Sequence, residues 1–180
     1  TQSISSPFFV SDEANNIHAF WVQSPSSVYD ESNASIYYAR WNGRRWLFDV
    51  SILGGLGGLP TQLSAEMDAD GRMFLTWVDA NNGDLLFSWA YADKANVPTE
   101  WLTPQRLPSL SQWTSAPDIL VDATGKLVVV YAVPLNDARG VYIVESSDSG
   151  QNWSLPIKVF DAVSEDWSMV DNPEIALDAG

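Results

Sequence analysis

The sequence predicts an all-β fold, a β-propeller built from four-stranded antiparallel blades. One pattern recurs along the chain, anchored on Asp12, Asp68, Asp122 and Asp178, which are spaced by 56, 54 and 56 residues. Each complete copy holds four short apolar runs separated by polar turns, and no segment has the periodicity of an amphipathic helix. Four strands per repeat of about this length are typical of propeller blades, which stack because a single blade cannot bury its own faces.

The first two strands of each blade flank the anchoring aspartate. A proline lies five residues before it in three copies, Pro7, Pro117 and Pro173. The segments "DADG" and "DATG" that follow the second and third copies of the first strand predict hairpin turns, because glycine adopts positive φ and aspartate caps its own turn. The second strand then ends on a large aromatic residue, which is Trp21, Trp77 or Tyr131.

The third and fourth strands complete the unit. The third strands are expected in "SIYYAR", "LLFSWA" and "VYIVES", and a polar turn ending on Trp46, Trp101 or Trp153 leads to a short fourth strand. The second and third strands are almost continuously apolar, which favours burial on both faces. The blades are expected at about residues 5–56, 57–110 and 111–165, with the first strand of a fourth blade at about 166–180.

Composition excludes several classes of function. The net charge of -14 and the pI of about 4.1 exclude a basic surface for nucleic acid. The chain has no cysteine for disulfides or thiolate metal sites, and its one histidine argues against a zinc site. No apolar stretch is long enough to span a membrane. No metal and no cofactor are therefore expected.

Residues 146–153, "SSDSGQNW", place Ser146, Asp148, Gly150 and Trp153 in the pattern Ser-x-Asp-x-Gly-x-x-Trp. These residue types suit a turn, because the side-chain oxygens can bind turn amides, glycine fits a tight backbone and tryptophan buries its ring. The segment resembles the Asp-box of the sialidase-like, or BNR-repeat, propellers. That resemblance implies a peripheral structural turn rather than a catalytic site. It also implies a six-bladed ring, reached through a longer chain or through self-association.

The same resemblance provides a test for catalysis. Enzymes of that family carry an arginine triad, an aspartate acid/base and a tyrosine–glutamate pair, with the first arginine in an Arg-Ile-Pro phrase on an early inner strand. Ser5 stands where that arginine would be, and no arginine precedes Pro117 or Pro173. No catalytic residue is therefore predicted within this chain, and the sequence leaves open whether the protein is an enzyme.

The loops that join second to third strands and blade to blade share one face of a propeller, the usual ligand face. They are rich in the carboxylates, amides and aromatics of sugar-binding surfaces. The candidate ligand residues are Asp79, Asn81, Asp84, Trp113, Asp137, Arg139 and Trp167, and the first such loop holds Tyr29, Asp30 and Glu31. The competing interpretation is a set of solvated loops with tryptophans buried between blades.

The predicted function is a non-catalytic module that binds glycans or another protein, in an extracellular or cell-envelope setting of a bacterium. The alternative is part of an exo-sialidase or related glycoside hydrolase whose catalytic residues lie outside these residues. A third interpretation is a purely structural scaffold.

Overall fold

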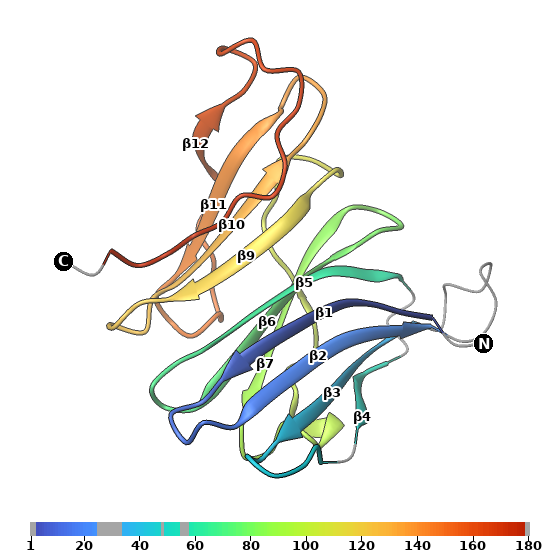
Figure 1. Ribbon diagram of the computed structural model, residues 1–180. Helices are drawn as coiled ribbons and strands as arrows, with labels where there is room; N and C mark the ends of the chain where they lie inside the picture. The colour runs from blue at the N-terminus through green and yellow to red at the C-terminus, as the bar shows by residue number, and fades with distance from the viewer. Residues whose placement is uncertain (1–2, 25–33, 48, 55–57, 179–180) are drawn as a thin grey trace.

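The computed structural model describes residues 3–24, 34–47, 49–54 and 58–178. In these ranges the chain forms three antiparallel sheets of four strands, ordered β1-β2-β3-β4, β5-β6-β7-β8 and β9-β10-β11-β12. The sheets fan out from the neighbouring strands β1, β5 and β9 (Figure 1). The described ranges contain no α-helix and a single short 3₁₀ turn, Pro98–Glu100. The predicted all-β propeller class is confirmed.

Each sheet is one blade, in which neighbouring strands are consecutive in the sequence. The strands of blade 1 are β1 (Ser3–Ser11), β2 (Ile17–Ser24), β3 (Ser35–Trp41) and β4 (Val50–Leu53). Those of blade 2 are β5 (Pro60–Met67), β6 (Arg72–Asp79), β7 (Asp84–Tyr91) and β8 (Gln105–Arg106). Those of blade 3 are β9 (Ser115–Val121), β10 (Leu127–Val133), β11 (Gly140–Ser146) and β12 (Ile157–Asp161).

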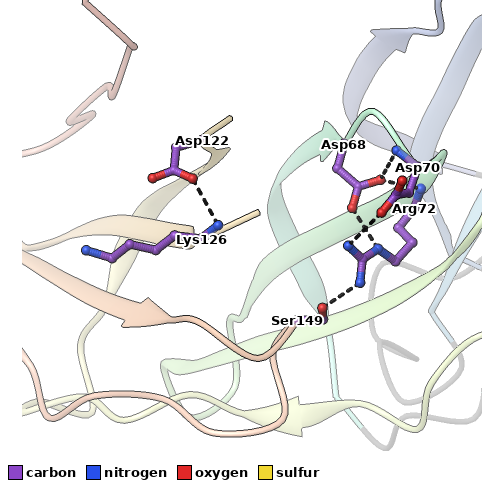
Figure 2. A network of polar contacts seen from close by, with 6 residues as sticks. All are labelled: Asp68, Asp70, Arg72, Asp122, Lys126 and Ser149. Atoms are coloured by element: carbon purple, nitrogen blue, oxygen red, sulfur yellow. Dashed lines mark hydrogen bonds and ion pairs between the residues drawn. The ribbon is translucent and has the colours of Figure 1, made fainter. Parts of the chain in front are cut away.

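The anchoring aspartates close the hairpins between the first and second strands. Asp68 Oδ1 accepts hydrogen bonds from the backbone amides of Asp70 and Arg72 at 3.0 and 2.8 Å. Asp122 Oδ1 accepts the corresponding bond from the Lys126 amide at 3.0 Å (Figure 2). Each carboxylate satisfies turn amides that would otherwise face solvent unpaired, and this explains why aspartate recurs at this point of the repeat.

The inner strands β1, β5 and β9 share an irregularity near their first residues. Pairing with the second strand shifts register there, and a residue other than glycine takes positive φ: Ser6 at 51°, Gln62 at 54° and Ala116 at 44°. Asn172 takes the same position in the fourth copy, with φ of 50°. Such bulges bend a strand and redirect its side chains, so each blade turns the same short stretch toward the middle of the fan.

The hydrophobic core lies between the blades rather than within any one of them. Phe20 and Tyr38 of blade 1 pack with Leu75 and Trp77 of blade 2. On the other face of blade 2, a second cluster joins it to blade 3, through Phe74, Phe87, Val129 and Tyr131 among others. Blade 2 is therefore covered on both sides.

The strand expected at residues 166–180 differs from the structure, because residues 162–178 contain no strand. An inner strand gains its ladder from the second strand of its own blade, and no described segment is placed to supply one. The segment nevertheless lies beside β9. The Ile175 amide donates to Asp118 Oδ2 at 3.1 Å, as the Ile119 amide donates to Ser64 Oγ at 3.2 Å one blade earlier. The C-terminal segment thus docks on β9 as β9 docks on β5.

Candidate functional site

A pocket of about 280 Å³ opens where the β6–β7 turn meets the connection from blade 2 to blade 3. We call it the Trp113 pocket; its lining is Thr61, Gln62, Val78, Ala80, Asn81, Asn82, Gly83, Gln112, Trp113, Thr114 and Ser115. Two of the sequence-predicted ligand residues, Asn81 and Trp113, are among them. The structure therefore brings together an indole and an amide that lie 32 positions apart in the sequence.

Close backbone packing holds Trp113 in place. Gly83 has φ of 72°, and a Cβ on it would lie 1.7 Å from the Gln112 carbonyl oxygen, so only glycine fits there. Thr114 Oγ1 donates to the Gly83 carbonyl at 2.6 Å. Trp113 itself stays 69% exposed. These contacts hold the backbone on both sides of Trp113, while its indole stays open to solvent and offers a surface on which an apolar ligand face can stack.

The neighbouring carboxylates are held by other parts of the protein. Asp79 Oδ1 accepts bonds from the amides of Leu59 and Asn81, both at 3.0 Å. Asp84 pairs with Arg106, with Oδ1 and Nη2 2.6 Å apart. Asp79 therefore supports the turn that carries Asn81, and the charge of Asp84 is balanced by Arg106 of β8.

The second group of predicted residues lies on blade 3. Arg139 Nε donates to the Trp167 carbonyl oxygen at 2.6 Å, which fixes the connection after β12 against the β10–β11 loop. The Trp167 ring packs edge-on against Phe160 and is 56% exposed. Asp137 is exposed on the same loop. The loop also approaches the Trp113 side, because Asn136 Nδ2 lies 3.5 Å from Ser111 Oγ.

A larger pocket of about 480 Å³ adjoins the bulges of the inner strands. We call it the inner-strand pocket; it is lined by Phe8, Gln62, Leu63, Ser64, Ala116, Pro117, Asp118, Asn172, Pro173 and Glu174. Gln62 lines both pockets, so the two adjoin. Ser64 Oγ donates to Asp118 Oδ1 at 2.7 Å. Burial, aided by the charge of Asp118, raises the pKa of the nearby Glu66 carboxyl.

Sequence reasoning missed this polar lining. The position just before the proline position takes positive φ in every copy, but it holds Ser6, Gln62, Ala116 and Asn172, so no shared residue type marks it in the sequence. Its meaning depends on the next blade: the Gln62 amide donates to Ser6 Oγ at 3.1 Å, and the Ala116 amide donates to Gln62 Oε1 at 3.0 Å. Side chains of one blade therefore accept hydrogen bonds from backbone amides of the following blade.

The turn at residues 146–153 has the geometry of a structural element. Ser146 Oγ donates to Asp148 Oδ1 at 2.8 Å, and the Gly150 amide donates to Ser146 Oγ at 2.9 Å. Hydrogen bonds from the backbone and side chain of Asn152 and from Ser146 lower the pKa of Asp148 to about 2. The Trp153 ring packs edge-on against Phe87 of blade 2, with centroids 5.1 Å apart.

An arginine ties this turn to the preceding blade. Arg72 Nη1 donates to Ser149 Oγ, while Arg72 Nε donates to Asp68 Oδ2 at 2.6 Å (Figure 2). The turn thus takes part in the contact between blades 2 and 3. Its assignment to the Asp-box family remains a prediction.

Three further observations concern the candidate site and the residues around it. Tyr29, Asp30 and Glu31 lie outside the described residues. Within the described ranges, no three His, Asp or Glu side chains are grouped so that they could hold a metal ion. The same part of the chain contains no helix long and apolar enough to cross a membrane.

Comparison with known proteins shows the fold. No protein-family model and no curated protein matches the sequence. Among solved structures, a Dyadobacter fermentans protein of unknown function has a TM-score of 0.67 at 12% identity, covering 88% of this chain and 56% of its own. The Hadza microbial sialidase Hz136 has a TM-score of 0.58 at 13% identity, covering 84% of this chain and 36% of its own. An exo-β-1,3-galactanase from Clostridium thermocellum also has a TM-score of 0.58 at 13% identity, covering 87% of this chain and 36% of its own.

The likeness is one of β-propeller architecture. At these identities it carries no residue of any active site across. The chain spans between 36% and 56% of the length of these three structures.

Proposed function

We propose that this chain is a non-catalytic glycan-binding module of a β-propeller, with Trp113 as the stacking platform. One observation carries the proposal: an indole that is 69% exposed stands on a closely packed backbone beside a pocket lined by amide side chains. Sugar rings offer an apolar face for stacking and hydroxyls for amides, so this combination of groups suits a glycan. The likeness to a sialidase and a galactanase supports the choice of ligand class by analogy.

The residues take separate roles in this proposal. Trp113 stacks on the sugar ring, and the amides of Asn81 and Gln112 exchange hydrogen bonds with its hydroxyls. Asp79 acts indirectly, because it holds the turn that presents Asn81, and Asp84 fixes Arg106 beside it. Arg139 and Trp167 extend the surface along blade 3, where a longer glycan would continue.

The proposal is tested by glycan-array screening followed by calorimetric titration of the best ligand. Trp113→Ala is expected to lower affinity at least about tenfold, the equivalent of 1.4 kcal/mol. The matched control is Trp46→Ala, which removes another half-exposed tryptophan on the outer side of blade 1. Equal affinity of the two variants for the ligand, with both folded, would rule out Trp113 as the platform.

The sequence-predicted alternative is part of a glycoside hydrolase whose catalytic residues lie outside this chain. One observation favours a different second candidate, in which this chain supplies carboxyl groups for hydrolysis. Asp118 and Glu174 both line the inner-strand pocket, and two carboxyl groups are what glycoside hydrolysis requires. Asp118 is already bonded to Ser64 and Ile175, which ties it to the contact between strands. Release of reducing sugar from an array ligand, abolished by Asp118→Asn, would support hydrolysis over simple binding.

A further inference from the structure

A small pocket lies at the opposite edge of the blades from the Trp113 pocket, where blade 1 meets blade 2. Its volume is about 180 Å³, and its lining is Tyr38, Arg40, Leu47, Ala92 and Asn96. We call it the Arg40 pocket. Tyr38 and Arg40 are two positions apart on β3, so both side chains leave the sheet on the face that packs against blade 2. Ala92 and Asn96 come from the connection between β7 and β8.

Arg40 is an uncompensated cation. In the described part of the chain it forms no ion pair and its guanidinium has no hydrogen-bond partner, and the Asn96 side-chain amide has none either. This is notable in a chain with 23 acidic and 9 basic residues. Arg40 is half-buried, so water screens its charge less than it would at a fully exposed position. The pocket thus offers N–H donors and positive charge without an acceptor.

A chain of hydrogen-bonded side chains, Tyr38, His18 and Asp12, lies behind the pocket, and we call it the relay. The Tyr38 hydroxyl lies 2.7 Å from His18 Nδ1, and His18 Nε2 lies 3.3 Å from Asp12 Oδ2. His18 is fully buried and is the cross-strand partner of Arg40 in the β2–β3 register. The charged groups that act on His18 are Asp12, from the β1–β2 turn, and Arg40, from β3. Burial lowers the pKa of His18 despite the opposing pull of Asp12.

The protonation state of His18 decides what Tyr38 offers to a ligand. Neutral His18 keeps its proton on Nε2, toward the Asp12 carboxylate, so Tyr38 donates to Nδ1 and its oxygen lone pairs are left for other contacts. Protonated His18 donates from both nitrogens. Tyr38 then accepts from Nδ1, and its own hydrogen is free to be donated elsewhere.

We propose that the Arg40 pocket binds a small oxyanion group, a carboxylate or a sulfate, and that binding is coupled to uptake of one proton by His18. The anion pairs with the Arg40 guanidinium and accepts hydrogen bonds from the Tyr38 hydroxyl and the Asn96 amide. A carboxylate or a sulfate ester brings one negative charge, which the proton taken up by His18 balances; inorganic sulfate brings two, which that proton and Arg40 balance together. The site is separate from the Trp113 pocket and does not depend on glycan binding there.

The coupling fixes the direction of the pH dependence. Because the anion favours protonated His18, it raises the pKa of that imidazole, and by reciprocity protonation tightens anion binding by the same factor. Each unit by which the anion raises that pKa corresponds to about a tenfold gain in affinity. Binding is therefore weak at neutral pH and strengthens as the pH falls through the titration of His18.

The test uses the fact that the chain has a single histidine, whose imidazole gives one set of NMR signals. The signals are titrated with pH at constant ionic strength in chloride alone, with sodium sulfate and with sodium glucuronate. Either oxyanion is expected to raise the titration midpoint, and the larger shift identifies a sulfate or a carboxylate as the preferred group. No shift with either anion would overturn the proposal.

Two variants with the same change of charge separate a specific site from general electrostatics. Arg40→Gln is expected to abolish the shift. Arg44→Gln, in the exposed turn that follows β3, is expected to retain it. Equal weakening in both variants would contradict a defined site. Tyr38→Phe is expected to reduce the anion-induced shift, because the hydrogen-bonded link to His18 is lost while the charge of Arg40 still acts on His18; a shift as large as in the unchanged protein would refute the relay.

Discussion

Blade 1 and blade 2 have the same order of strands but differ in what covers them. In β5, the first strand of blade 2, four of the eight residues are buried, whereas in β1, the first strand of blade 1, not one residue is. Trp77 is fully buried, while Trp21, at the same point of the repeat, is only half-buried. A blade's apolar pattern therefore marks the faces that can be covered, and the neighbouring blade decides which of them gain stability from burial.

The largest test of this comparison is a pair of tryptophan substitutions. Trp77→Ala is expected to lower the free energy of unfolding by about 3–5 kcal/mol, because it opens a cavity between blades 1 and 2. Trp21→Ala is expected to cost clearly less, since its ring already has solvent on one side. Urea denaturation followed by circular dichroism measures both. Equal losses would show that the contact between blades is not the source of stability.

Two glycine substitutions compare a position at the contact between blades with a position in an open turn. Gly150 and Gly125 have φ of 85° and 81°, so alanine is strained at either position. A Cβ at Gly150 would lie 2.4 Å from the Phe87 ring of blade 2, whereas one at Gly125 meets nothing within 4 Å. Gly150→Ala is therefore expected to cost about 1–3 kcal/mol more than Gly125→Ala. Thermal unfolding of both variants tests this, and a smaller loss at Gly150 would mean that blade 3 can move away from blade 2.

Two serine substitutions compare the contacts between neighbouring inner strands, β5 with β9 and β1 with β5. Ser64→Ala is expected to cost about 1–3 kcal/mol, because it leaves the Ile119 amide without a partner and removes the bond to Asp118 Oδ1 at the join of blades 2 and 3. Ser6→Ala, at the exposed join of blades 1 and 2, is expected to cost less, since water can replace its bond to the Gln62 amide. Hydrogen exchange at these two amides gives the measurement. A larger increase in exchange rate at Gln62 than at Ile119, each relative to the unchanged protein, would reverse the ranking.

The smallest expected effect concerns the acid stability of the turn at residues 146–153. The pKa of Asp148 is about 2, below its usual value of about 3.9, so its contribution to stability is present above pH 4. That contribution is lost as the pH falls from about 4 to about 2. Asp148→Asn should therefore flatten the pH dependence of the urea midpoint over this range. An unchanged slope would assign the dependence to other carboxylates.

The sequence predicted the blades well because strands and hairpins are local. The 54- to 56-residue spacing of the aspartates, with apolar runs at fixed offsets, is enough to set the order of strands. The sequence could not tell which of the tryptophans that end the turn before the fourth strand, Trp46, Trp101 and Trp153, are buried. Trp101 is buried and its Nε1 donates to the Ala95 carbonyl at 2.9 Å, whereas Trp46 is half-exposed beside Trp41.

The candidate site was predictable in its residue types but not in its roles. Trp113 and Asn81 line one pocket, and their role as ligand residues stays a prediction, whereas Asp84 is paired with Arg106, a contact set by the pairing of β7 with β8. The Arg40 pocket was not foreseen at all, because its walls come from two blades.

By itself the sequence determined the repeat, the strands and the turns, since these depend on patterns within a few residues. The tertiary structure decided which copies are covered, which carboxylates are already satisfied and where Arg40 is left without a partner. Those outcomes depend on contacts between residues some 20 to 60 positions apart, such as the one that joins Ser64 to Asp118. Such contacts form only when one blade packs against the next, and no local pattern encodes the distance between them.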